Sequence, residues 1–141
     1  MISPYEIVSK SALPALRAMV ARRLQLDYNM TQQQVAAALG ITQASVSNYT
    51  RKTRGMMVNF ESDPTVAKAV DTIARGLSKK NPDQRKALKS MTDVLDYIRL
   101  NRLMCSLHSD LDPGFQVEGC YACDGGLSGK GFDRLKVSAG N

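Results

Sequence analysis

The segment that most constrains the fold runs from Thr31 to Gly55 and reads TQQQVAAALGITQASVSNYTRKTRG. It contains two Thr-Gln pairs, eleven residues apart, with Gly40 between them. Thr31 followed three residues later by Gln34 is a capping-box pattern, which predicts the start of a helix. Gly40 can adopt the left-handed conformation that ends a helix, and Thr42 can cap the next one. The segment therefore predicts two short helices joined by a tight turn.

The apolar and polar positions of these two helices separate. Val35 and Leu39 lie four apart on the first helix, Ile41 follows the turn, and Val46 and Tyr49 are expected to face inward on the second. The outward positions of the second helix are short and uncharged: Gln43, Ala44, Ser47 and Asn48. Gln and Asn can pair with the adenine edge in the major groove, and alanine can contact a thymine methyl group. Such a face suits base edges better than it suits a solvated surface.

A basic cluster follows the second helix. Arg51, Lys52 and Arg54 are placed to hold phosphate groups beside the uncharged face. The alternative is an ordinary helical hairpin inside a bundle, with an outward face that happens to be polar. The whole pattern, a Thr-Gln start, a Leu-Gly-Ile turn, a second Thr-Gln and an inward valine, favours DNA reading over that alternative.

These residues, MTQQQVAAALGITQASVSNYTRKTRG, resemble the helix-turn-helix of the XRE group, which includes the phage lambda repressor and Cro. The resemblance implies a compact helical protein that binds two-fold symmetric operator DNA as a dimer. It also implies that Gln32 braces the second helix and touches phosphate, and that Gln43 contacts phosphate and the adjoining base. The candidate DNA-binding residues are Gln32, Thr42, Gln43, Ala44, Ser47, Asn48, Arg51, Lys52 and Arg54. The flanking segment SPYEIVSKSALPALRAMVARRL is similar to a group of archaeal regulators, but Pro14 and the long C-terminal extension depart from the phage repressors.

The N-terminal flank predicts two helices. Ser3, with Pro4 next and Glu6 three positions on, is a capping-box pattern with proline in the first turn, so a helix should start at Pro4. Pro14 should break or kink that helix, because proline has no amide hydrogen and its ring clashes with the preceding turn. A second helix is then expected from about 15 to 27.

Two more helices are expected after a linker at 59–63. Asp63-Pro64 predicts the first, with one apolar stripe made of Val66, Ala69, Val70, Ile73 and Leu77. Asn81-Pro82 predicts a longer one, with an apolar set made of Leu88, Met91, Val94, Leu95 and Ile98. The two carry more apolar surface than one small domain needs, so we predict that residues 61–104 form a homodimer interface.

All three cysteines and the only histidine fall between positions 105 and 123. They form Cys105-x2-His108, eleven intervening residues and Cys120-x2-Cys123. Two ligand pairs with this spacing can complete one tetrahedral metal site. The sequence therefore predicts a metal centre held by Cys105, His108, Cys120 and Cys123.

Several alternatives stay open for this cluster. Asp110, Asp112 or Asp124 could replace the histidine as fourth ligand. The cysteines could instead be a buried helix-end residue and a pair of free or redox-active thiols. Zinc would act as a structural clamp, whereas an iron–sulfur cluster, also held by thiolates, would act as a redox or iron sensor. The residues alone do not separate the two metals, and the lack of another evident small-molecule pocket favours a cluster.

The net charge of +6 is unevenly distributed, with +5 in residues 1–60, +3 in residues 61–104 and −2 in residues 105–141. A basic front half fits a polyanionic partner. No stretch approaches the ~20 apolar residues of a membrane span, and no signal peptide is visible, so a cytoplasmic protein without a membrane partner is expected. No catalytic triad, HExxH motif or phosphate-binding glycine loop is present, and the His-x-Glu of zinc deaminases is missing. An enzyme is therefore not expected.

The sequence thus predicts an all-α protein in four parts. Residues 1–60 form a lambda-repressor-like helix-turn-helix domain, and residues 61–104 form dimerisation helices. Residues 105–126 form an irregular metal-binding segment, and residues 127–141 form a flexible tail. The predicted function is a transcriptional regulator that binds operator DNA as a dimer, with an iron–sulfur or zinc centre as its input. The same regulator with a purely structural zinc site, and an antitoxin-like protein-interaction module, are the alternatives.

Overall fold

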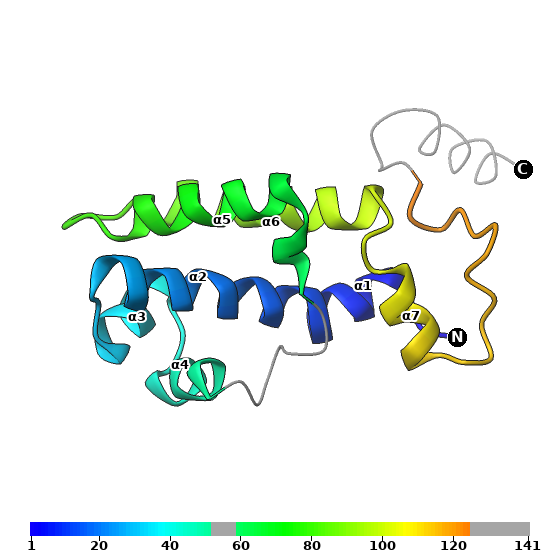
Figure 1. The fold of residues 1–141 in the computed structure, drawn as a ribbon, viewed down its shortest axis with the longest axis horizontal. Coiled ribbons are helices and arrows are strands. Elements are labelled where there is room, and N and C mark those ends of the chain that lie inside the picture. Colours follow the sequence, from blue (N-terminus) through cyan, green and yellow to red (C-terminus); the bar gives the residue numbers. More distant parts are fainter. Residues whose placement is uncertain (52–58, 125–141) are drawn as a thin grey trace, which may run out of the picture.

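The computed structural model describes residues 1–51 and 59–124, and every regular element within them is helical. The elements α1 (Pro4–Ile7), η1 (Val8–Ala12) and α2 (Leu13–Tyr28) follow one another without a break. They form the long helical segment along the middle of the molecule (Figure 1). Ser3 and Glu6 form the predicted capping box at its start.

Of the predicted break or kink at Pro14, the break is wrong, because the chain stays helical from Pro4 to Tyr28. Val8–Ala12 is a π-helical turn, in which the Leu13 amide donates to the Val8 carbonyl, five residues earlier. Pro14 lies at the start of α2, directly after this wider turn. The π-helical turn accommodates the ring and the missing amide of the proline without ending the helix, so the helical segment continues to Tyr28.

The hairpin after α2 has the predicted local structure. α3 (Gln32–Leu39) begins at Thr31, whose amide donates to Gln34 Oε1 at 2.8 Å. It ends at Gly40, which has φ +66°, and α4 (Gln43–Thr50) begins with Thr42 as its cap. Both helices pack on α2 and on each other. The two capping residues and the left-handed glycine are confirmed.

Replacing Gly40 with alanine is expected to lower the free energy of unfolding by about 1–2 kcal/mol, because a Cβ atom disfavours the left-handed conformation. The space around both Gly40 and Gly76 is open, so no steric clash contributes at either position. Gly76 lies in a helix with ordinary φ, and its change to alanine should stabilise the protein by roughly 0.5–1 kcal/mol. Urea unfolding of the two variants measures both changes in the free energy of unfolding. If both changes had the same sign, the left-handed turn at Gly40 would be contradicted.

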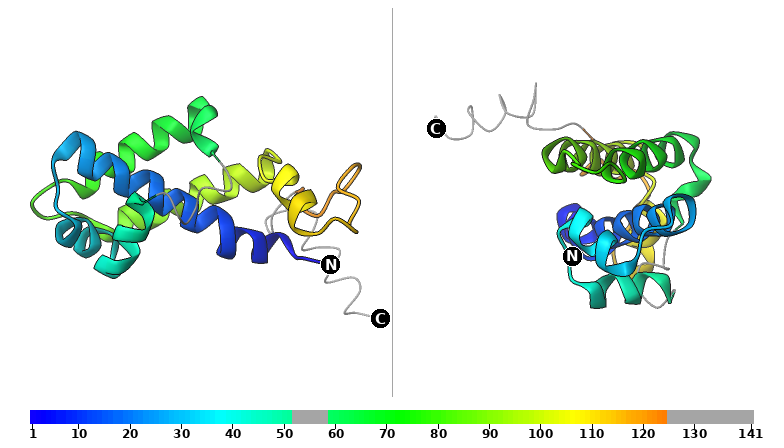
Figure 2. Two further views of the ribbon diagram at one scale, coloured as in Figure 1. Left: turned by 60° about the horizontal axis from the view of Figure 1, so that its bottom comes forward. Right: turned by 90° about the vertical axis from the view of Figure 1, so that its left-hand side faces the viewer.

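The other side of α2 is covered by two longer helices, α5 (Pro64–Leu77) and α6 (Gln84–Leu100). α5 packs on both α2 and α6, so α5 and α6 lie on the opposite side of α2 from α4 (Figures 1 and 2). The predicted α5 stripe is buried here, apart from Ala69, which is half-buried. The apolar stripe of α5 is therefore largely covered within one chain, and homodimerisation stays a prediction.

Three details between Asn59 and Leu100 differ from the sequence prediction. The linker contains a 3₁₀ turn, η2 (Phe60–Ser62), whose phenylalanine is buried. α6 starts later than Pro82, because the Asp83 carboxylate accepts from the amides of the second and third helical residues. Leu88 is 66% exposed, since the buried stripe of α6 continues through Ala87.

The segment from 105 onward starts with a helix that the sequence did not predict, α7 (Cys105–Leu111). It packs against α1, where Leu107 and the preceding Met104 are buried. The Ile2 amide donates to Asp112 Oδ2 at 3.0 Å, just beyond the end of α7. The beginning of the chain and the Cys/His region therefore lie together, at the end of the molecule away from α3 (Figure 1).

Candidate nucleic-acid interface and Cys/His cluster

α4 is the outermost helix on its side of the molecule (Figures 1 and 2). Val46 is fully buried and Tyr49 is 8% exposed, and these inward side chains fix α4 against α2 and α3. Both residues were predicted to face inward, and both predictions are confirmed. The rotation of α4 about its own axis is thus set by its buried face, which determines the residues that it presents outward.

The predicted reading residues lie where that face meets solvent. Gln43 and Ala44 are exposed at the first turn of α4, and Ser47 and Asn48 are half-buried one turn further on. The chemistry that this face offers is an amide pair, a methyl group and a hydroxyl, with no charge anywhere in α4. Such groups can pair with base edges without having to shed a tightly held hydration shell.

The other predicted contacts surround α4. Gln32 is half-buried at the start of α3, and Arg51 is exposed directly after α4. Thr42 is exposed, but its hydroxyl accepts from the Ser45 amide at 3.1 Å and lies 2.8 Å from Ser45 Oγ, so it serves as a helix cap. Lys52 and Arg54 lie outside the described residues.

The four predicted metal ligands lie around one small cavity of about 10 Å³. Cys105 and His108 come from consecutive turns of α7, and Cys120 and Cys123 come from the loop that follows it. The remaining lining residues are Pro4, Arg102, Val117 and Ala122. As these side chains lie, no group of three or more His, Cys, Asp or Glu residues in 1–51 and 59–124 could hold a metal ion, so metal binding by the four predicted ligands stays a prediction.

His108 is the buried polar side chain of this cavity. It is 7% exposed, and its Nε2 atom has no hydrogen-bond partner. The imidazole stacks on Phe115, with ring centroids 4.7 Å apart and planes 6° from parallel, so the ring cannot easily turn to find a partner. A buried polar atom without a partner costs about 1–3 kcal/mol, which a ligand at this atom would offset.

A backbone turn surrounds the second cysteine pair. The Ala122 amide donates to Cys120 Sγ at 3.4 Å. Gly119 has φ +72°, a conformation that lets the chain turn immediately before Cys120. The Cys120 sulfur is therefore held by a backbone amide from within the same loop.

Two arginines that were not among the predicted site residues lie next to the Cys/His cluster. Arg99 is 8% exposed, donates to the Cys123 carbonyl at 3.3 Å and lies 6.0 Å above the Tyr5 ring. Arg102 donates to both Asp124 carboxylate oxygens, at 2.8 and 2.7 Å. Burial raises the pKa of the Cys123 thiol and the Cys105 thiol adds to that effect, whereas the Arg99 charge opposes it.

The aspartates proposed as alternative ligands have other surroundings. Asp112 accepts from the Ile2 amide, and Asp124 is paired with Arg102. Asp110 is exposed, and neither it nor the other two lines the cavity. Of the four candidates for the last ligand, His108 is the one that lines the cavity with a buried atom that has no partner.

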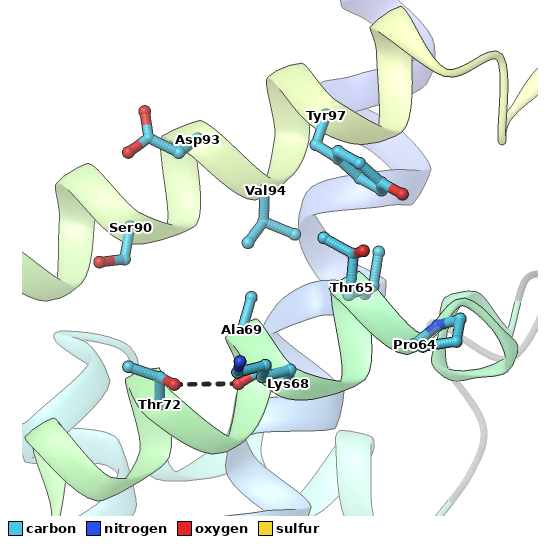
Figure 3. Close-up of a pocket in the computed structure, with 10 residues that line it drawn as sticks. Pro64, Thr65, Lys68, Ala69, Thr72, Ser90, Asp93, Val94 and Tyr97 are labelled. Carbon is cyan, nitrogen blue, oxygen red and sulfur yellow. Dashed lines mark hydrogen bonds between the residues drawn. The ribbon is translucent and has the colours of Figure 1, made fainter.

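A groove of about 630 Å³ lies between α5 and α6, with α2 behind both helices (Figure 3). Apolar and small side chains line it, together with Lys68 of α5 and Asp93 of α6. The sequence had given no sign of a second pocket, and this was the reason to prefer an iron–sulfur cluster over zinc. The groove contradicts that reason.

Taken together, the capped hairpin on α2, the buried side of α4 and its uncharged outer face define a helix-turn-helix DNA-binding fold. A family model described as helix-turn-helix matches residues 20–55, which include most of α2 and all of α3 and α4. No curated protein and no solved structure matches the chain. The match supports an XRE-like, DNA-binding regulator in general terms. Among the described residues, no helix is long and apolar enough to cross a membrane.

Proposed function

We propose that this chain is a sequence-specific transcriptional regulator that binds operator DNA as a homodimer. The observation that carries the proposal is the outer face of α4, where Gln43 and Ala44 are exposed while Val46 and Tyr49 fix the helix from behind. A helix held in this way can enter the major groove with its first turn leading. The proposal assigns base contacts to Gln43, Ala44, Ser47 and Asn48.

Phosphate contacts would position this helix. Gln32 is the first residue of α3, and Arg51 directly follows the last residue of α4. Lys52 and Arg54 come next in the sequence. Cationic and amide side chains at such positions bind phosphate oxygens and set the register on the duplex. Thr42 contributes by capping α4, which keeps its first turn in place.

A dimer on a two-fold operator requires both α4 helices to face the same duplex. The α5–α6 pair covers the opposite side of α2 from α4 (Figure 2). Pairing through the outer groove of α5 and α6 would therefore point the two α4 helices away from each other. In the operator-bound dimer, the two chains would therefore contact each other through a surface other than this groove. Within residues 61–104, the groove between α5 and α6 is thus excluded from the proposed interface.

The proposal includes a metal centre at Cys105, His108, Cys120 and Cys123, holding zinc or an iron–sulfur cluster. Their common cavity, the buried His108 Nε2 and the bond to Cys120 Sγ support it. A cluster would supply a redox or iron input to the regulator, whereas zinc would stabilise the end of the molecule at which α1 begins.

Selection from a pool of random duplexes tests the DNA-binding proposal. We expect enrichment of one sequence with two inverted half-sites, bound by two chains as measured by light scattering of the complex. Affinity for the enriched duplex should exceed that for a scrambled one by roughly 10³-fold or more at physiological salt. Equal affinity for both duplexes, with only a steep salt dependence, would show charge-driven binding and refute sequence reading.

A further inference from the structure

Three cationic side chains line a second pocket between α5 and α6. Arg75 comes from the last turn of α5, Lys79 from the loop that follows, and Lys86 from the first turn of α6. The pocket has a volume of about 430 Å³, and of the described residues that line it, Asp83 is the one with a carboxylate. Positive charge therefore exceeds negative charge in its wall, which suits an anion.

These three cations have no carboxylate partner in the part of the chain that the structure describes. None of them forms an ion pair with a residue of 1–51 or 59–124. Other carboxylates of the same helices are engaged, because Asp71 pairs with Arg23 and Asp93 pairs with Lys89. The Asp83 Oδ1 atom accepts from the amides of the second and third residues of α6. The positive charge of the pocket is thus available to a ligand.

Two residues of the pocket run against the preferences of their own helices. Lys86 is the third residue of α6, where the helix dipole disfavours a cation and favours an anion. Gly76 lies inside α5, where glycine is destabilising, yet no atom lies within 4 Å of the position that a Cβ would take. Close packing within the described chain therefore does not require this glycine. Residues that break a local rule in this way are typical of functional sites.

The cationic pocket adjoins the groove of about 630 Å³ between α5 and α6, because Thr72 and Ser90 line both. Beyond these two residues the groove is mostly apolar, and Ala69 and Val94 point toward each other from the two helices (Figure 3). A ligand that fills both spaces has an anionic group at the loop end and an apolar part along the helices. Three cations, one of them an arginine, suit the several oxygens of a phosphate group better than a single carboxylate.

The pocket also adjoins the helix-turn-helix. Gln84, the first residue of α6, donates through Nε2 to the Ala37 and Ala38 carbonyls in the last turn of α3, at 3.1 and 3.3 Å. The pocket residues Asp83 and Lys86 lie on either side of Gln84 in the sequence. A ligand that binds the start of α6 would therefore act on the segment that holds the end of α3.

We propose that Arg75, Lys79 and Lys86 bind the phosphate group of a small organic phosphate, and that its apolar part lies in the groove between α5 and α6. This site does not depend on DNA binding. Its role as an effector site rests on the proposed function, since an effector needs a regulator to act on. The groove is free for such a ligand in the proposed operator-bound dimer, whose interface excludes it.

Isothermal titration calorimetry of the full chain without DNA tests the site, with octyl phosphate as the probe and inorganic phosphate for comparison. We expect one octyl phosphate per chain, bound about tenfold or more tightly than inorganic phosphate, because it alone buries apolar surface. Absence of octyl phosphate binding would overturn the proposal, and equal affinity for the two probes would overturn the role of the groove. Probe binding that is lost as the protein self-associates would show a second copy of the chain in the groove and overturn the ligand class.

Matched pairs of substitutions locate the phosphate group. Lys79→Gln with Lys86→Gln should weaken octyl phosphate binding about tenfold or more. Lys80→Gln with Arg85→Gln removes the same charge from adjacent exposed positions that do not line the pocket, and should change the affinity less than about twofold. Equal losses in the two pairs would indicate general attraction between a basic protein and an anion, which contradicts a defined site.

Operator affinity with and without saturating octyl phosphate tests the effector role. We expect a change of about fivefold or more in the unchanged protein and none in the variant with Lys79→Gln and Lys86→Gln. Probe binding without any change in operator affinity would overturn the effector role and leave the site in place. If the duplex selection found no operator, the proposed function would fail, whereas the calorimetry would still report on the site.

Discussion

Replacing Leu24 with alanine is expected to lower the free energy of unfolding by about 2–5 kcal/mol, because the change leaves a cavity in a packed interior. Leu24 is fully buried on α2, the helix that contacts α3, α4 and α5. Its carbonyl also accepts from the Asn29 and Met30 amides, which turn the chain towards α3. A cavity at this position therefore weakens the attachment of the whole helix-turn-helix to its scaffold.

Leu26 provides a matched control two residues along the same helix. It is 77% exposed, so Leu26→Ala should change stability by no more than about 0.5 kcal/mol. Urea unfolding followed by circular dichroism measures both variants, and an unchanged m-value would show that stability alone has shifted. Similar losses in both variants would mean that α2 does not bury the face described above.

The hairpin could be predicted because its signals are local. A capping box at Thr31, a glycine at position 40 and a cap at Thr42 act within one helical turn, so the sequence contains the whole interaction. The inward positions Val46 and Tyr49 follow from helical spacing once the ends are known. These are the elements in which the prediction and the structure agree.

The errors arise where distant contacts decide the outcome. The passage of the chain through Pro14 depends on a π turn, and no local residue pattern predicts such a turn. The exposure of Leu88 follows from packing, because α6 turns Ala87 and Met91 rather than Leu88 towards the core. α7 is short, and packing on α1 stabilises it rather than its own propensity.

The candidate metal site shows the same division. The spacing of its cysteines and histidine is visible in the sequence, so the four residues around the cavity could be predicted, and their metal binding stays a prediction. The position of Arg99 beside this site could not be predicted, because it depends on contacts with Tyr5 and Cys123, which lie far from Arg99 along the chain. The sequence signal was present but weak, since a charged residue directly follows the buried Ile98 on a helix.

The combined substitution of Gln43 and Ser47 by alanine is expected to weaken binding of the dimer to the selected operator by about 1000-fold or more. Each well-placed contact to a base edge contributes roughly 1–3 kcal/mol of discrimination, and the double variant removes two from each half-site. Gln43 is exposed and Ser47 is half-buried, and neither belongs to the buried core, so circular dichroism of the double variant should match that of the unchanged protein. Fluorescence anisotropy with labelled duplex measures the loss at fixed salt.

Two exposed hydroxyls on the other side of α2 serve as the control. Thr72 and Thr92 each donate to a carbonyl of their own helix, so the pair Thr72→Ala with Thr92→Ala also removes two polar groups from helix surfaces. Its operator affinity should equal that of the unchanged protein. An antitoxin-like module that binds a protein partner predicts a different result, in which both double variants bind DNA equally weakly. The comparison therefore separates base reading by α4 from the general attraction between a basic protein and DNA, because only base reading depends on which side of α2 loses its polar groups.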